Sequence, residues 1–79
     1  MGDITRIQRQ LALRLYNLRK DRLWTLEAAA YECELNRNYY ADLEKGIRNP
    51  SLEVLLKLAK GFNLSLSELL EDLNEKIKD

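Results

Sequence analysis

The side chains best suited to recognising another molecule are consecutive and stand at the start of one short predicted helix. Arg37, Asn38 and Tyr39 are polar and open a helix expected over residues 37–45. A guanidinium group matches the two acceptors on the major-groove edge of guanine, and a carboxamide matches the donor and acceptor of adenine. Both groups also bind phosphate oxygens. The segment therefore predicts contact with base edges or phosphates, with ordinary solvated residues as the alternative interpretation.

Residue types that perform catalysis or bind transition metals are scarce. The 79 residues include no His and one Cys, Cys33, and the acidic residues are scattered. Zinc sites and Cys–His or Ser–His nucleophiles need the residue types that are missing, and acid–base catalysis needs positioned groups. We therefore expect no enzyme, no metal and no cofactor, and we interpret Cys33 as a small core residue.

The sequence contains no pattern that indicates secretion or membrane insertion. It has no signal-peptide pattern and no apolar run near the roughly 18 residues of a spanning helix. A single thiol cannot form an internal disulfide, which suits a reducing compartment. We expect a cytoplasmic protein without a membrane partner.

The charges balance, with 13 Lys and Arg against 13 Asp and Glu. A net charge of zero argues against strong non-specific binding to nucleic acid. The first 50 residues carry nine Lys and Arg against seven Asp and Glu, so the mild basic excess lies there. This asymmetry alone predicts no function.

Apolar residues recur at helical spacing along nearly the whole chain, and no run alternates as a strand would. The predicted helices cover residues 4–21, 26–34, 37–45, 52–60 and 66–77 of a single domain. Residues suited to N-caps precede the last four helices, namely Thr25, Asn36, Ser51 and Ser65. Gly46 and Gly61 are expected to end the third and fourth helices. The sequence thus predicts an all-α, compact five-helix bundle.

The second and third predicted helices, joined by a turn of about three to four residues, have the arrangement of a helix-turn-helix. The run Leu43-Glu44-Lys45-Gly46-Ile47-Arg48-Asn49-Pro50-Ser51-Leu52 closely resembles the signature of the phage-repressor (Xre/Cro-like) family. The resemblance extends over about residues 7–70 and implies a lambda-repressor-like DNA-binding domain that regulates transcription. Residues 37–44 resemble the recognition helix of restriction–modification controller proteins.

The resemblance implies a role for each polar residue around the third helix. Arg37, Asn38 and Asp42 would face bases in the major groove, and Tyr39 a base or a phosphate. Asp42 would accept from a cytosine amino group or discriminate by repulsion, although a plain surface charge is the alternative. The implied phosphate contacts are Thr25, Lys45, Arg48 and Asn49. A buried ion pair between Arg19 and Glu44 would tie the first helix to the third.

Two positions depart from the family pattern. Leu26 stands where the family usually has a Gln that contacts phosphate, so that contact is not expected. Glu34 stands where the family usually has Gly, which permits a left-handed backbone. We therefore predict a different turn before the third helix.

The fifth predicted helix carries more apolar surface than one small core needs. In related regulators this part often forms a two-fold interface, so the resemblance implies a homodimer through Leu66, Leu69, Leu73 and Ile77. Of these, only Leu73 and Ile77 are expected to be purely intermolecular. A dimer would bind a palindromic operator with half-sites about one helical turn apart. The alternatives are a protein–protein interaction module, such as an antitoxin or regulatory partner, and the DNA-binding part of a larger regulator.

Overall fold

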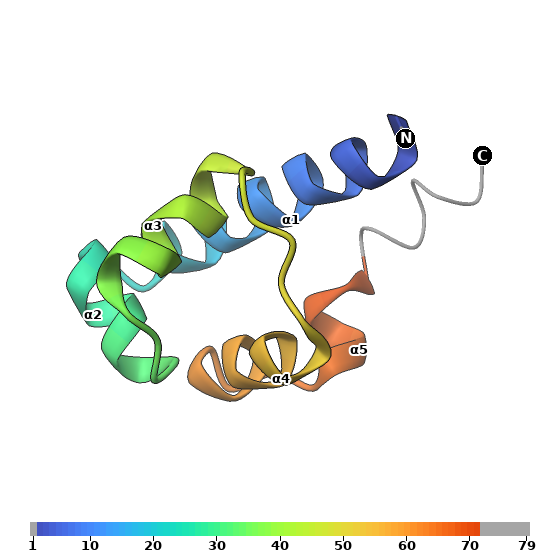
Figure 1. Ribbon diagram of the computed structural model, residues 1–79. Helices are drawn as coiled ribbons and strands as arrows, with labels where there is room; N and C mark the ends of the chain where they lie inside the picture. Colours follow the sequence, from blue (N-terminus) through green and yellow to red (C-terminus); the bar gives the residue numbers. More distant parts are fainter. Residues whose placement is uncertain (1, 72–79) are drawn as a thin grey trace.

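Five α-helices form the part of the chain that the computed structural model describes, residues 2–71. They are α1 (Gly2–Asp21), α2 (Leu26–Glu32), α3 (Arg37–Lys45), α4 (Leu52–Gly61) and α5 (Leu66–Leu69) (Figure 1). The predicted all-α class is confirmed, and the predicted extension of the fifth helix to residue 77 lies outside the described residues. None of the described helices combines the length and the apolar character needed to cross a lipid bilayer.

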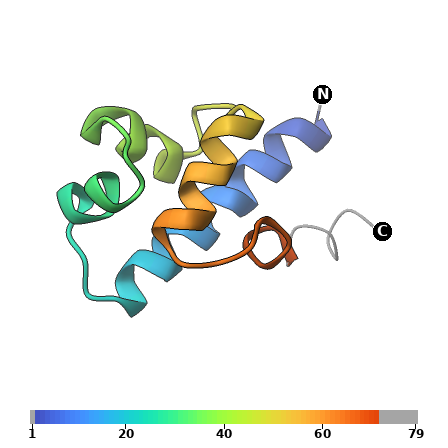
Figure 2. The ribbon, with the colours of Figure 1, turned by 90° about the horizontal axis from the view of Figure 1, so that it is seen from below.

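The helices pack as two groups around the long α1. α3 contacts both α1 and α2, while α4 contacts α5. Figure 1 shows α2 and α3 on one side and α4 with α5 on the other, joined by the extended loop after α3. Figure 2 shows α4 crossing in front of α1 when the molecule is seen from below. The arrangement leaves the outer side of α3 uncovered.

All five helices contribute to one apolar core. The predicted helical spacing of apolar residues is confirmed on α1, where Leu11, Leu15 and Leu18 are buried and Ile7 packs against the core. The other buried members are Ala29, Ala30, Cys33, Tyr40, Leu43, Leu58, Ala59, Phe62 and Leu69. The expectation that Cys33 fills the core is confirmed.

The predicted N-caps all form. Asn36 Oδ1 accepts from the backbone N–H groups of Asn38 (2.8 Å) and Tyr39 (3.1 Å). The remaining caps are Thr25 to Ala28 (3.1 Å), Ser51 to Val54 (3.2 Å) and a capping box between Ser65 and Glu68. Such caps satisfy N–H groups that have no partner in the first turn. Asn36 and the left-handed Gly46 (φ 76°) fix α3 at both ends, as predicted.

α4 ends with Gly61, but Gly61 does not take the left-handed conformation expected of a helix-ending glycine. Gly61 is the last helical residue, one position beyond the predicted bound, and Asn63 takes the left-handed conformation after it (φ 60°). A Cβ at position 61 would overlap Cys33 Sγ and would lie 2.8 Å from Cys33 Cα and 2.9 Å from the carbonyl oxygen of Glu32. Gly61 is therefore needed for the close approach of α4 to the end of α2.

The prediction of a different turn at Glu34 is wrong. Glu34 adopts the left-handed conformation itself, with φ 57°, so the turn keeps the geometry that a Gly would favour. For a residue with a Cβ this conformation costs about 1–2 kcal/mol. The chain stores this strain between α2 and α3.

Replacing Glu34 by Gly is expected to stabilise the fold by about 1 kcal/mol, because the strain disappears while Gly loses more entropy on folding. For a domain of this size the melting temperature should rise by about 4–8 °C. Thermal unfolding followed by circular dichroism measures the shift. Glu34→Ala is the control, since it removes the exposed carboxylate but keeps the Cβ. An equal gain in both variants would assign the effect to charge rather than to backbone strain.

Candidate nucleic-acid interface

α3 is anchored through its inner face, which leaves its first residues open to solvent. Tyr40 and Leu43 are 0% and 2% exposed and lie in the core. Arg37 and Asn38, on the first turn, are exposed. The cap at Asn36 holds this turn, so the two side chains project from a fixed backbone. The structure thus presents these two predicted base-contact residues together.

Among the residues that the structure describes, Arg37 makes only weak contacts. Its Nε lies 3.4 Å from Glu27 Oε2, and the two side chains are 48% and 71% exposed. Its Nη1 lies 3.5 Å from Asn38 Oδ1, at the outer limit of a hydrogen bond. Exposed ion pairs contribute about 0–1 kcal/mol. Arg37 can therefore exchange these partners at little cost.

Asp42 and Arg48 form an ion pair that the sequence did not indicate. Arg48 Nε donates to Asp42 Oδ2 at 3.3 Å. The Arg48 Cζ also lies 5.4 Å from the centre of the Tyr39 ring, within the range of a cation–π contact. A predicted base-contact residue and a predicted phosphate-contact residue are thus joined, with Tyr39, in one cluster. We call these three residues the Arg48 cluster.

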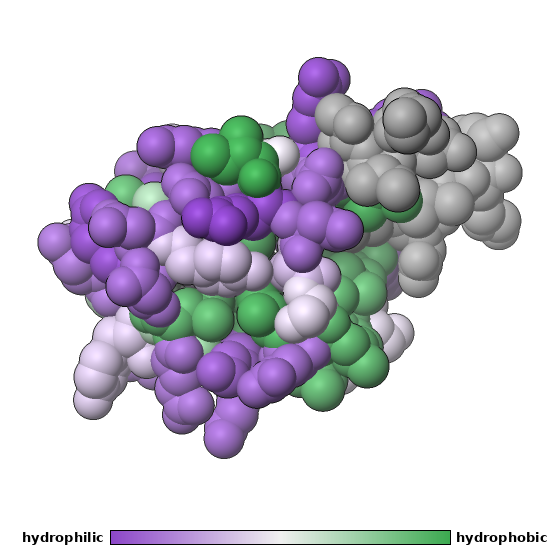
Figure 3. Space-filling model, viewed as in Figure 1, coloured by the Kyte–Doolittle hydropathy of each residue, from purple (hydrophilic) through white to green (hydrophobic). Residues whose placement is uncertain are grey.

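Three of the predicted phosphate-contact residues lie at or just beyond the C-terminal end of α3, and the fourth lies before α2. Lys45, Arg48 and Asn49 are exposed at the end of α3 and in the following loop. Thr25 is exposed at the start of α2, and its oxygen accepts the Ala28 N–H while its hydroxyl hydrogen stays available. Polar side chains cover most of the surface over α3 and its ends in Figure 3. This surface offers several hydrogen-bond donors to the anionic sugar-phosphate backbone of a nucleic acid.

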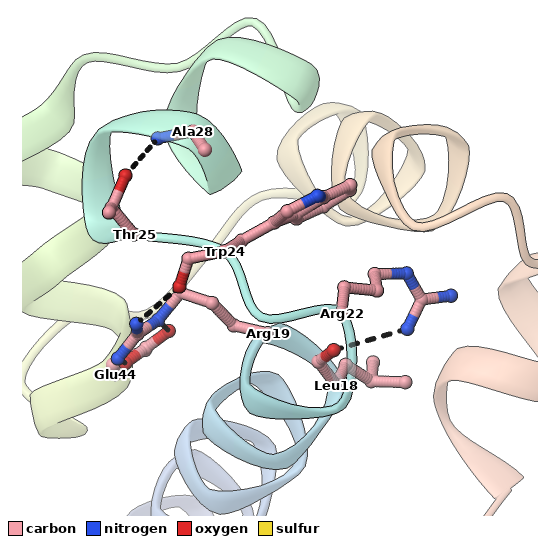
Figure 4. A network of polar contacts seen from close by, with 7 residues as sticks. All are labelled: Leu18, Arg19, Arg22, Trp24, Thr25, Ala28 and Glu44. Atoms are coloured by element: carbon pink, nitrogen blue, oxygen red, sulfur yellow. Dashed lines mark hydrogen bonds and ion pairs between the residues drawn. The ribbon is translucent and has the colours of Figure 1, made fainter.

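The ion pair between Arg19 and Glu44 forms beneath this surface, as the resemblance implies (Figure 4). Arg19 Nε donates to Glu44 Oε2 at 2.8 Å and Nη2 donates to Oε1 at 3.0 Å, so the ion pair is bidentate. Arg19 Nη1 donates to the Trp24 carbonyl at 3.0 Å. The two charged side chains are only 12% and 8% exposed. The hydrogen bond to Glu44 raises the pKa of Arg19, and the network ties α1 to α3 and to the α1–α2 connection.

The other ionisable groups buried in the core remain uncharged. Burial raises the pKa of Cys33 to about 12, with Glu32 adding a smaller effect. Burial first, and then Glu44, raise the pKa of Tyr40. Among residues 2–71 no group of three or more Cys, Asp or Glu side chains is arranged to hold a metal ion. The core under α3 therefore acts as a neutral support.

Sequence reasoning missed the arginine that joins the ends of α1 and α4. Arg22 donates to the Leu18 carbonyl at 3.1 Å (Figure 4) and to the Phe62 carbonyl at 2.7 Å. Its guanidinium also lies over the rings of Trp24 and Phe62, which stack with centres 5.4 Å apart. Basic side chains near a helix end often bind the last carbonyls, and this is the signal that the sequence offered.

The predicted dimer residues are placed differently from one another. Leu69 is 0% exposed and fills the core, so its assignment to an interface is corrected. Leu66 is partly buried against the core, and Leu73 and Ile77 lie outside the described residues. Leu52 and Leu56, which the sequence pattern did not single out, are 63% and 50% exposed one turn apart on α4. Their spacing of four residues places them on one face of a helix, and this is the sequence pattern that indicates an apolar pair there.

Comparison with known proteins settles the family. The sequence profile of the family described as "Helix-turn-helix" matches residues 15–69. The chain belongs to this helix-turn-helix family. It is 38% identical over 64 residues to the control protein C.MunI of a Mycoplasma species, covering 80% of this chain and 86% of that protein. It is 35% identical over 63 residues to the control protein C.BamHI of Bacillus amyloliquefaciens, covering 80% and 70%.

The helix-turn-helix fold of the chain matches a solved structure of the same kind. The restriction-modification controller protein C.AhdI from Aeromonas hydrophila superposes with a TM-score of 0.74 at 34% identity, covering 78% of this chain and 94% of that one. The resemblance to controller proteins is thereby confirmed. With further relatives that are helix-turn-helix transcriptional regulators, the chain is a DNA-binding transcription regulator and not an enzyme, as the sequence predicts.

Proposed function

We propose that the chain acts in the cytoplasm as a homodimer that binds a palindromic DNA operator, with α3 in the major groove. The observation that carries this proposal is the capped start of α3, where Arg37 and Asn38 are exposed over a buried inner face. In a helix-turn-helix the N-terminal residues of the second helix contact base edges. Arg37 pairs best with guanine and Asn38 with adenine.

Phosphate contacts on either side of the groove would hold α3 in register. Thr25 lies before α2, and Lys45 and Asn49 lie at and just beyond the C-terminal end of α3. Such contacts position a protein on the duplex without reading its sequence. Leu26 packs against the core, which agrees with the absence of a polar contact from that position.

The dimer would use the apolar side of α4 together with the segment after α5. Leu52 and Leu56 expose apolar surface on α4, which contacts α5. Leu66 borders this part of the fold, and Leu73 and Ile77 extend the apolar spacing beyond it. A second copy of the chain would bury these residues. It would also set the two α3 helices about one helical turn of DNA apart, the spacing of the two half-sites.

Leu56→Lys is expected to shift the protein from dimer to monomer, because a charge would be buried in the interface without a partner. Sedimentation velocity over a range of protein concentrations measures the state. Leu23→Lys is the matched control, since Leu23 is 92% exposed in the α1–α2 turn and should leave the dimer intact. A dimer that survives the change at Leu56 would place the interface elsewhere.

Selection from a randomised duplex pool at two salt concentrations tests the function. A regulator of this kind should enrich a two-fold symmetric site and lose affinity steeply as salt rises, because binding releases counterions. Binding without any enriched site, or no binding, would contradict the proposal and favour the protein–protein interaction module.

A further inference from the structure

We propose that Asp42 is a positioning residue, which orients Arg48 for a DNA phosphate and does not itself read a base. The inference rests on the proposed operator binding and deepens it. It starts from the Arg48 cluster, in which the Arg48 guanidinium contacts both the Asp42 carboxylate and the Tyr39 ring.

The geometry of the pair leaves the binding end of Arg48 open. Asp42 Oδ2 engages Nε, the nitrogen nearest the chain, at 3.3 Å. Within residues 2–71, neither terminal nitrogen of Arg48 makes a hydrogen bond or ion pair. A guanidinium group has five N–H donors in a fixed fork, so four remain on the two terminal nitrogens. These four can bind a phosphate while the contact to Asp42 persists.

Burial and ring contact add to this orientation. The Asp42 side chain is 24% exposed and the Arg48 side chain 51%. The carboxylate is therefore the more buried partner, and the guanidinium is the more accessible to a ligand. The Tyr39 ring, 5.4 Å from Arg48 Cζ, supports one face of the guanidinium. Holding a flexible arginine in its binding orientation lowers the entropy lost on association.

The same geometry argues against Asp42 as a reader of cytosine. Its Oδ2 is occupied by Arg48, and an unpaired carboxylate near phosphates would oppose binding by repulsion. The pair with Arg48 neutralises that charge. If Asp42 only repels phosphates, its removal should strengthen DNA binding. If it positions Arg48, its removal should weaken DNA binding.

The test is a double-mutant cycle on the selected operator duplex, with wild type, Asp42→Ala, Arg48→Ala and the double variant. Positioning predicts that Asp42→Ala weakens binding by about tenfold in the wild-type background, although it removes a negative charge. In the Arg48→Ala background the same change should leave binding unchanged or strengthen it up to about threefold. Asp42→Glu, which retains a carboxylate, should recover part of the affinity.

Each other outcome overturns the inference. Tighter binding by the same factor in both backgrounds would make Asp42 a repelling charge. Equal weakening in both would make it an independent base contact, and no change in either would leave it without a role. Thermal unfolding of each variant excludes a loss of fold as the cause. Failure of the wild type to select any duplex would instead reject the proposed function, and this inference with it.

Discussion

Replacing Glu44 by Gln is expected to destabilise the fold by about 3–5 kcal/mol, since removal of one partner leaves a buried charge uncompensated. Arg19 is 12% exposed and donates to both carboxylate oxygens. A neutral amide can accept only one of these hydrogen bonds, and its NH₂ group would face a donor. A domain of this size has a stability of about 5–15 kcal/mol, so the variant should be close to unfolding at 37 °C. Urea denaturation measures the loss.

Two further variants make this expectation specific. Glu27→Gln is the matched control, because it breaks an ion pair of the same chemistry that is largely exposed, and it should cost less than about 1 kcal/mol. The double variant Arg19→Met with Glu44→Leu should regain much of the stability, because an apolar pair needs no compensation. A cost below about 1 kcal/mol for Glu44→Gln would show that the buried pair is held no more tightly than the exposed one.

The parts of the fold that could be predicted from the sequence are those fixed by local chemistry. Asn36 and Gly46 determine the bounds of α3 through hydrogen bonds and backbone preferences within a few residues. The Ser65–Glu68 capping box is equally local. The leucines of α1 repeat at helical spacing, so their burial follows from periodicity.

The features that sequence reasoning missed depend on how distant segments meet. Gly61 looked like a helix end, but its role comes from Cys33, 28 positions earlier, which lies against it. Arg22 reaches the Phe62 carbonyl across 40 positions. At Glu34 the family pattern suggested a changed turn, yet packing of α2 against α3 keeps the left-handed conformation despite its cost.

Some features of the candidate site could be predicted from local sequence, and others depend on how separate segments meet. Exposure of Arg37 and Asn38 follows from their place on the first turn of a helix whose Tyr40 and Leu43 are apolar. The pairing of Asp42 with Arg48 depends on the course of the loop after Gly46, which no helical period describes. The proposed dimer surface would depend on a second chain, so the sequence could indicate only apolar surface in excess of the core.

Replacing Arg37 by Ala is expected to weaken binding of the dimer to its operator by about 2–6 kcal/mol. A good bidentate contact between Arg and guanine contributes about 1–3 kcal/mol of discrimination, and a dimer loses the contact in both half-sites. The weak pair with Glu27, 3.4 Å away and exposed, offsets little of this. Titration of the selected duplex, and of duplexes changed at one base pair in each half-site, measures both affinity and specificity.

The salt dependence of the same variant separates a base contact from a phosphate contact. Loss of a base contact should leave the slope of log K against log salt unchanged while relaxing specificity at one position of each half-site. Loss of a phosphate contact should weaken all duplexes alike and make the slope shallower by about one for each contact. Lys45→Ala provides that second pattern for comparison, because Lys45 lies at the far end of α3. If Arg37→Ala behaves like Lys45→Ala, Arg37 helps to hold the duplex in place, and the reading of bases passes to Asn38 and Tyr39.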